Sequence, residues 1–237
     1  MKFATLNSLV LALLGAFAVG LSAQASENLK FLNGYVTAPG VVTSEPGEPG
    51  PPAEGAQGVY VGPYTAQVTS LPGQPIIDVF CVDYFHDITP GTTWTAYTES
   101  LNGSLSLTRL AGEGSSTVQK TYLEAAWLAS QFASNPTTSW ADIDNAIWYL
   151  TSPPGSFNTP DAAALSWVGM AMADYGSVNP NSWEVLTDVT AWNGSTYTNG
   201  GTQEYLVNVT PEPGSIILFG TGLVGIVLGG VVKRSLA

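Results

Sequence analysis

The densest group of chemically active side chains follows one predicted strand and consists of Cys81, Asp83, His86 and Asp87. These residue types could hold a metal ion, and zinc in particular takes Cys and His ligands. In a continuous strand, Cys81 and Asp83 would share one face while His86 would point to the other. The sequence holds no second Cys or His to complete a zinc site. We therefore expect no metal and no cofactor, and we expect these residues to form hydrogen bonds at a strand end and turn.

Signatures of catalysis are weak in the rest of the chain. Residues 142–145 begin like a calcium-binding loop but lack its glycine and its distant glutamate, so we interpret Asp142 and Asp144 as acids in a first helical turn. A serine hydrolase would have to use His86, and no G-x-S-x-G motif occurs. A glycosidase-type carboxylate pair stays open, because any two acids could meet in space. We expect a protein that is not an enzyme, with a secreted carbohydrate-active enzyme as an alternative.

Composition narrows the class of protein further. The 237 residues are 45% hydrophobic and only 10% charged, and the formal net charge is −12. Such a charge repels a phosphate backbone and excludes nucleic acid as a partner. The length suits one globular domain with additional segments at its ends. A lone cysteine permits no internal disulfide.

The first residues have the organisation of a secretory signal peptide. Lys2 precedes an apolar run over residues 9–21, and Ala23 and Ala25 supply the small side chains that signal peptidase accepts. The run is too short to cross about 30 Å of hydrocarbon, which argues against an uncleaved anchor. We predict that residues 1–25 are a signal peptide cleaved after Ala25.

The C-terminal segment is predicted to cross a membrane. Residues 215–232 are 18 consecutive residues without a charge, and an α-helix of that length spans about 27 Å. Lys233 and Arg234 follow directly, and basic residues stay on the cytoplasmic side. We expect this helix to anchor the chain in the inner membrane with the preceding domain in the periplasm.

The residues before this segment form a rigid joint. Pro211, Glu212 and Pro213 cannot propagate a helix or a sheet, so they are expected to be extended and open to a protease. Residues 210–237 resemble the PEP-CTERM protein-sorting tail, because Pro-Glu-Pro is followed by an apolar helix and then by a basic end.

The resemblance assigns a role to each part of the tail. It implies that exosortase, an integral-membrane cysteine protease, recognises Pro211, Glu212 and Pro213, while the apolar helix holds the membrane and Lys233 with Arg234 forms the stop. It also implies a Gram-negative bacterium and a final location at the cell surface or in the extracellular matrix. Bearers of such tails often occur beside exopolysaccharide genes, so exopolysaccharide is a candidate partner.

The middle of the chain predicts a sheet. Residues 26–58 are interpreted as an N-terminal segment with a flexible Pro/Gly-rich loop, because few apolar residues are available there to offset the ordering entropy. The exported α+β domain is expected over residues 59–209. Alternating and β-branched stretches predict strands at residues 59–61, 64–68, 76–82, 92–97, 105–110, 183–189 and 204–209. Asn102 and Gly103 are expected to form a hairpin turn.

A helical period interrupts these strands. Apolar residues at helical spacing predict a first helix over residues 116–133. A second helix is expected to begin at a capping box of Ser139 and Asp142 and to end before Pro153. A third is expected to begin at Thr159 and to end near Gly176. The predicted fold class is α+β: an antiparallel sheet or barrel-like domain with an inserted helical subdomain, plus one C-terminal transmembrane helix.

Three stretches of the domain resemble the thioester domains of Gram-positive surface adhesins, namely residues 80–83, 122–128 and 146–151. In that family a strand cysteine joins a glutamine, and the internal thioester acylates a host amine. Here Asp144 stands in the place of the glutamine, and Gln131 lies in another helix without a matching motif. A carboxylate would have to expel hydroxide, so Cys81 is not expected to close a thioester unaided. A covalent adhesin stays as an alternative function.

Apolar packing is the expected role of the remaining candidates. Cys81 is interpreted as a small buried hydrophobe, and Trp127 and Trp148 as core residues rather than sugar-stacking platforms. The leading hypothesis is an exported, non-enzymatic surface or matrix protein whose domain binds a ligand outside the cell.

Overall fold

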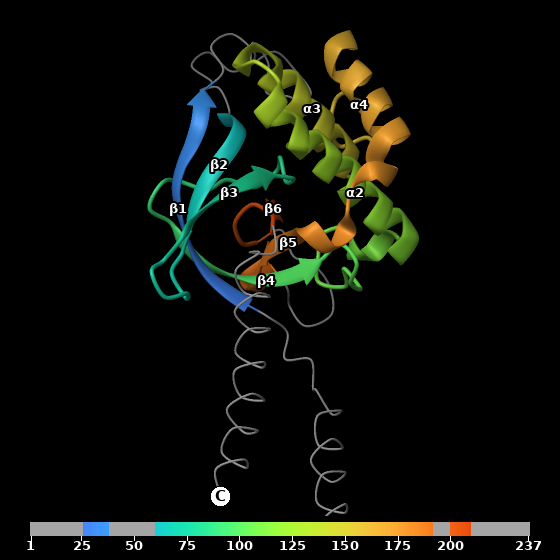
Figure 1. Ribbon diagram of the computed structural model, residues 1–237. Coiled ribbons are helices and arrows are strands. Elements are labelled where there is room, and N and C mark those ends of the chain that lie inside the picture. The colour runs from blue at the N-terminus through green and yellow to red at the C-terminus, as the bar shows by residue number, and fades with distance from the viewer. Residues whose placement is uncertain (1–25, 38–59, 192–199, 210–237) are drawn as a thin grey trace, which may run out of the picture.

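The structure, a computed structural model, describes residues 26–37, 60–191 and 200–209. In this described part, six strands form a closed barrel in the order β1-β2-β3-β6-β5-β4, and every neighbouring pair is antiparallel. The strands are β1 (Ser26–Thr37), β2 (Tyr60–Val68), β3 (Ile76–Cys81), β4 (Thr93–Ser100), β5 (Trp183–Asp188) and β6 (Tyr205–Asn208). The helices α2 (Ser115–Gln131), α3 (Trp140–Thr151) and α4 (Ala162–Asp174) lie between β4 and β5 in sequence. Figure 1 shows them packed around one end of the barrel. The predicted α+β class, a barrel with a helical insertion, is confirmed.

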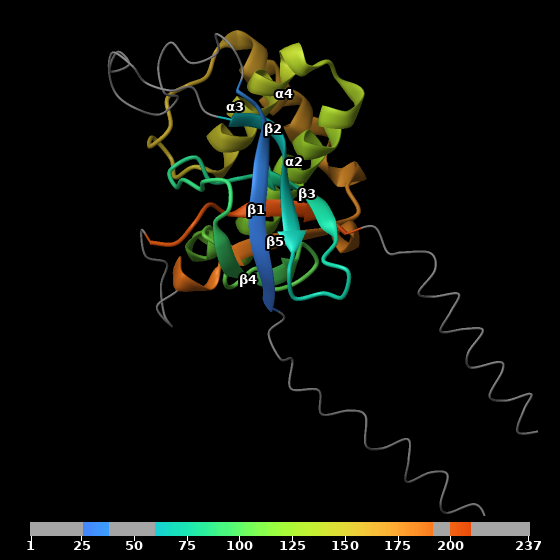
Figure 2. The ribbon, with the colours of Figure 1, turned by 90° about the vertical axis from the view of Figure 1, so that its left-hand side faces the viewer.

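β1 is not among the predicted strands, yet it closes the barrel. Leu29 pairs with Val68 of β2 on one side and with Trp94 of β4 on the other. Leu29 and Phe31 are buried, as the strand period requires. Figure 2 shows β1 running along the barrel from end to end. The barrel therefore takes up residues 26–37 from the predicted N-terminal segment.

β2 is one strand, whereas the sequence predicts two separated by a turn. Its pairing with β1 shifts register between Gly34 and Val36, which accommodates Gly62 and Pro63 within the strand. Gly62 has φ +95°, and a Cβ atom there would overlap the ring of Trp140. The strand can therefore approach α3 this closely only because residue 62 has no side chain.

The predicted strand over residues 105–110, and with it the hairpin at Asn102 and Gly103, is wrong. This segment wraps around Glu99, whose carboxylate accepts hydrogen bonds from Ser106 N at 3.0 Å and Leu107 N at 2.7 Å. Leu105 has φ +52°, which ends any extended conformation there. The alternate leucines are buried, so their spacing imitates a strand although the backbone turns.

The helices begin and end close to the predicted residues, but their caps differ. Asp161 caps α4 by accepting hydrogen bonds from Ala163 N and Ala164 N, both at 3.0 Å, in place of the predicted Thr159. Ser139 makes no side-chain cap at α3, so the predicted capping box is wrong. Short 3₁₀ turns occupy Ala111–Glu113, Phe132–Ser134, Thr137–Ser139, Tyr175–Ser177, Pro180–Ser182 and Val189–Ala191.

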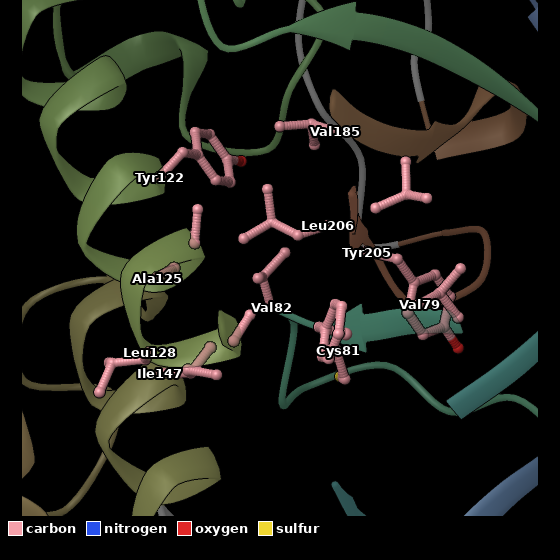
Figure 3. Packing of buried hydrophobic residues seen from close by; sticks show 14 of the residues in the cluster. Val79, Cys81, Val82, Tyr122, Ala125, Leu128, Ile147, Val185, Tyr205 and Leu206 are labelled. Carbon is pink, nitrogen blue, oxygen red and sulfur yellow. The ribbon is translucent and has the colours of Figure 1, made fainter. Parts of the chain in front are cut away.

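One hydrophobic cluster joins the barrel to its helices. Figure 3 shows Tyr122 and Ala125 of α2 facing Leu206 of β6, with Val82 between the helices and the barrel. Phe80 stacks on Phe132 with ring centroids 5.8 Å apart. The helices therefore complete the core of the barrel and do not form a separate domain.

The predicted core roles of the two tryptophans are confirmed. Trp148 is buried, and Trp127 is partly buried against the same cluster, 6.4 Å from the ring of Trp167. Among the described residues, no helix is both long enough and apolar enough to cross a bilayer. The predicted membrane helix over residues 215–232 and the predicted signal peptide lie outside the described residues, as does most of the predicted flexible loop.

Candidate functional site

A cavity of about 450 Å³ lies where the helical end of the barrel meets the turn after β3. We call it the Asp83 pocket, and its polar lining comes mainly from Asp83, His86, Arg109, Ser152, Ser156 and Glu204. These residues come from four separate stretches of the chain. The volume falls in the range of cavities that bind small molecules.

Asp83 is the centre of the polar cluster. Its carboxylate lies 2.6 Å from Arg109 Nε and 2.8 Å from His86 Nδ1. It also accepts a hydrogen bond from Phe85 N at 3.2 Å, which fixes the turn after β3. The strand ends at Cys81, so His86 folds back onto Asp83, and the prediction that the two residues lie on opposite faces is wrong. Hydrogen bonding at a strand end and turn is confirmed.

Arg109 connects the loop after β4 to the segment leading into β6. Its Nη2 donates to the Thr202 carbonyl oxygen at 2.7 Å, and its backbone N–H donates to Glu204 Oε1 at 2.8 Å. The Nη1 group lies 3.4 Å from His86 Nε2. A mostly buried Asp–Arg pair with further hydrogen bonds is costly to break, because a single partner left behind would be an uncompensated buried charge.

Glu204 lines the pocket and is buried. It accepts hydrogen bonds from the Tyr122 hydroxyl and from Thr187 Oγ1, the latter at 2.7 Å. Burial raises the pKa of the Glu204 carboxyl from its ordinary value of 4.5 to about 7, although the hydrogen bonds from Tyr122, Thr187 and Arg109 favour the ionised form. The carboxyl therefore changes protonation near neutral pH.

Two aromatic side chains, those of Tyr84 and Phe85, also line the pocket. Phe85 is exposed at the pocket, and its ring lies edge-on to Tyr84 at 5.4 Å. Tyr84 in turn lies 5.2 Å from Trp148 and 5.1 Å from Phe157. The pocket thus combines an exposed ring with charged and hydroxyl groups, a combination that suits a ligand with both apolar faces and polar edges.

Cys81 and Asp144 lie in the interior, outside the pocket lining. Asp144 Oδ2 accepts a hydrogen bond from Gly62 N, and no described residue makes a hydrogen bond to its Oδ1. Burial raises the pKa of Asp144 well above its ordinary value. Burial, with the charges of Asp83 and Asp144, also raises the pKa of the Cys81 thiol. The thiolate is the nucleophilic form of a cysteine, and this environment favours the thiol.

The other residues singled out from the sequence are placed apart from the pocket. Asp142 lies in the first turn of α3, as predicted, whereas Asp144, also predicted there, is the fifth residue of the helix and is buried. Gln131 Nε2 donates to the Trp127 carbonyl oxygen of its own helix at 3.2 Å. Within the described ranges, no group of three His, Cys, Asp or Glu side chains could hold a metal ion.

Local sequence patterns do not point to Arg109 or Glu204, nor to Phe85, Ser152 and Ser156, which also line the pocket. Arg109 is the only arginine between residues 26 and 210, which is the one signal that could have drawn attention to it. Glu204 carries no local signal, because its importance comes from contacts with Tyr122 and Thr187 of other elements.

The fold and the pocket define an α+β barrel domain with a cavity of ligand size. Residues 209–234 match the family model described as the PEP-CTERM protein-sorting motif. The chain therefore carries a PEP-CTERM sorting motif, which supports export, membrane association before processing, and processing by exosortase for anchoring at the surface. The searches of curated proteins and of solved structures found no match to the chain.

The match begins at the residue after β6 and so does not cover the barrel. The resemblance of the barrel domain to thioester adhesins is not shown by the comparisons. Three groups of predicted site residues lie outside the described part of the structure. They are the sorting residues Pro211, Glu212 and Pro213, the signal-cleavage residues Ala23 and Ala25, and the stop residues Lys233 and Arg234.

Proposed function

We propose that this chain is a non-enzymatic binding protein of the cell surface or extracellular matrix. After signal peptidase cleavage, the helix over residues 215–232 holds it in the inner membrane with the barrel in the periplasm. Exosortase then acts at Pro211, Glu212 and Pro213 and delivers the barrel outward. The observation that carries the proposal is the sorting motif, which starts at Val209, directly after the last barrel strand.

The proposed ligand of the barrel is a saccharide unit of exopolysaccharide, bound in the Asp83 pocket. Support comes from the exposed Phe85 ring, on which a sugar face could stack, beside the polar groups of His86 and Arg109. Residues 26–210 carry 17 acids and 3 bases. This net negative charge opposes binding of polyanions and favours neutral sugars.

Binding is favoured over catalysis by the state of the two pocket carboxyls. Glu204 has a pKa suited to a general acid, but its side chain is only 1% exposed and its oxygens are occupied by Tyr122, Thr187 and Arg109. Asp83 is committed to Arg109 and His86. Neither carboxyl has the open access to substrate that glycoside hydrolysis requires.

Sorting is tested by mass spectrometry of the C-terminus in protein recovered from the native host. We expect the wild-type C-terminus near Pro213 and expect the Glu212→Ala variant to retain Ala237. Glu48→Ala is the matched control, because Glu48 also precedes a proline in a Pro/Gly-rich run. Steady-state wild-type protein ending at Ala237 would count against exosortase processing.

Ligand binding is tested by titrating the protein with the host's own polysaccharide. Phe85→Ala should weaken binding about tenfold, as expected for loss of one aromatic contact of roughly 1–1.5 kcal/mol. Tyr60→Ala removes a ring outside the pocket that is also exposed, at 37% against 46% for Phe85, and should leave affinity unchanged. Polysaccharide turnover that vanishes in an Asp83→Asn, Glu204→Gln double variant would favour the enzyme alternative.

A covalent adhesin is the second candidate function. The observation that favours it is that Cys81 on β3 and Asp144 on α3 both lie in the interior. The charge of Asp144 contributes to raising the pKa of the Cys81 thiol. Intact-mass measurement decides the question, because a thioester formed with an amide loses ammonia and one formed with a carboxylic acid loses water. Unmodified mass together with alkylation of Cys81 in the unfolded chain would exclude it.

A further inference from the structure

A second cavity, of about 430 Å³, lies at the end of the barrel where β1 begins and β6 ends. We call it the tail-side cavity. Its apolar lining includes Leu29, Val68, Leu71, Ile77, Leu186 and Val207. In Figure 1 this end of the barrel lies opposite the end covered by α3 and α4. The cavity is thus separate from the Asp83 pocket.

The rim of this cavity carries exposed apolar side chains. Leu71 lines the cavity from the connection between β2 and β3 and is 45% exposed, and Ile76, the first residue of β3, is 62% exposed beside the lining residues Pro75 and Ile77. Lys30 of β1 pairs with Gln67 of β2, and Gln67 pairs in turn with Ile76 of β3, so the three residues lie in one row across the strands. Apolar side chains next to a lysine are typical of a surface that meets the interface of a membrane.

The rim is held in place by hydrogen bonds. Thr69 N donates to the Asn28 carbonyl oxygen at 2.7 Å, which ties the loop to the start of β1. Gln74 N donates to the Leu71 carbonyl oxygen at 3.0 Å, which closes the loop on itself. The apolar tip therefore keeps a fixed position relative to the barrel end.

The sorting tail leaves the barrel at this same cavity. Val209, the last described residue, lines it, and five residues separate Val209 from Ser215, where the apolar segment begins. Whatever their conformation, these residues cannot span more than about 20 Å. If the apolar segment lies in a bilayer, the tail-side cavity is held close to the bilayer surface at a high effective concentration.

We infer that the tail-side end of the barrel, through Leu71 and Ile76, docks on the outer surface of the membrane that holds the sorting tail. This inference rests on the anchor in the proposed function. The cavity also carries Glu27 and Glu184, whose charges oppose anionic headgroups. The partner is therefore a predominantly zwitterionic lipid surface. Cleavage by exosortase would remove the membrane anchor and so release this end of the barrel from the lipid.

The test uses the full chain reconstituted in phosphatidylcholine vesicles that carry nitroxide lipid. An environment-sensitive dye is attached at Leu71→Cys or, as the matched control, at Met172→Cys. Met172 is also exposed, at 52%, but lies on α4 and does not line the tail-side cavity. The native Cys81 is buried and does not compete for the dye in the folded protein. We expect quenching at position 71 to be several-fold greater than at position 172.

Two further arms make the result specific. Adding Ile76→Ser to the Leu71→Cys protein should reduce quenching, and vesicles rich in phosphatidylglycerol should also reduce it. Equal quenching at positions 71 and 172 in vesicle-bound protein overturns docking and leaves the anchor intact. If the dyes on two protein molecules contact each other and lipid does not quench them, a second copy of the chain covers this surface, and docking on lipid is likewise overturned. Protein that does not float with the vesicles overturns both the anchor and the docking that depends on it.

Discussion

Two carboxyl groups of the Asp83 pocket illustrate how neighbours decide the chemistry of a residue. Asp83 faces a guanidinium and an imidazole, whereas Glu204 faces a phenol, a hydroxyl and a backbone N–H and is fully enclosed. Burial raises the pKa of Glu204 to about 7. A carboxyl group thus serves as an ion-pair partner at position 83 and as a group that holds its proton at mildly acidic pH at position 204.

The first prediction concerns the pH dependence of stability. The folded state binds the Glu204 proton more tightly than the unfolded state, so the stability contribution is complete below the ordinary pKa of 4.5 and is lost as pH rises toward 7. The shift corresponds to about 3 kcal/mol. We expect the Tm of the wild type to fall between pH 5 and pH 8, and Glu204→Gln to flatten this fall, as measured by thermal denaturation followed by circular dichroism.

Asp144 contributes with the same sign, because burial also raises its pKa. The Glu204→Gln variant should therefore keep a smaller slope, which Asp144→Asn reduces further. Glu113→Gln changes an exposed carboxyl in a 3₁₀ turn and is the control that should follow the wild type. A wild-type Tm that rises from pH 5 to pH 8 would show that Glu204 is not a buried, proton-binding group.

At the scale of elements, the contact between β2 and α3 depends on one glycine. Gly62 has φ +95°, its N–H donates to Asp144, and a Cβ atom there would overlap Trp140. Gly62→Ala therefore combines backbone strain with overpacking and should lower the free energy of unfolding by about 3 kcal/mol. Urea denaturation measures this change. Gly112→Ala adds a Cβ atom with no neighbour within 4 Å at a residue without positive φ, so a loss of similar size there would contradict the explanation.

The start of α4 separates a cap seen in the structure from a cap expected from sequence. Asp161 accepts two backbone N–H groups, whereas Thr159 is two residues too early. Asp161→Ala should cost about 1 kcal/mol of stability, and Asp161→Asn much less. Thr159→Ala should have no measurable effect in the same urea titration. The opposite order of the two alanine variants would restore Thr159 as the cap.

At the scale of the whole molecule, the barrel and helices share one core. We therefore expect a single cooperative unfolding transition, in which the helical signal and the tryptophan fluorescence change together. Cys81 is buried between the two parts and reports on both. Its labelling by a thiol reagent should be absent in the native protein and should appear across the same urea range. Labelling that precedes the loss of helical signal would indicate that the helices and barrel unfold separately.

Local patterns predict the helical insertion and most strands, because apolar periodicity in residues such as Tyr122 and Ala125 reports directly which face is buried. The same rule fails at residues 105–110, where alternate leucines are buried by turns around Glu99. It also misses β1, whose alternation is short and adjoins a Pro/Gly-rich stretch. The pocket is out of reach of local patterns, because Asp83, Arg109 and Glu204 are distant in sequence.

The sequence alone determined the predicted address of this protein, because a sorting enzyme and a lipid bilayer recognise linear features such as the Pro-Glu-Pro joint and the apolar segment after it. The PEP-CTERM motif is confirmed on that basis. Only the tertiary structure decided that β1 closes the barrel, that Arg109 and Glu204 join Asp83 in one pocket, and that the sorting tail leaves beside Leu71. Those outcomes depend on contacts between distant residues, whose burial and charge are set by the folded chain as a whole.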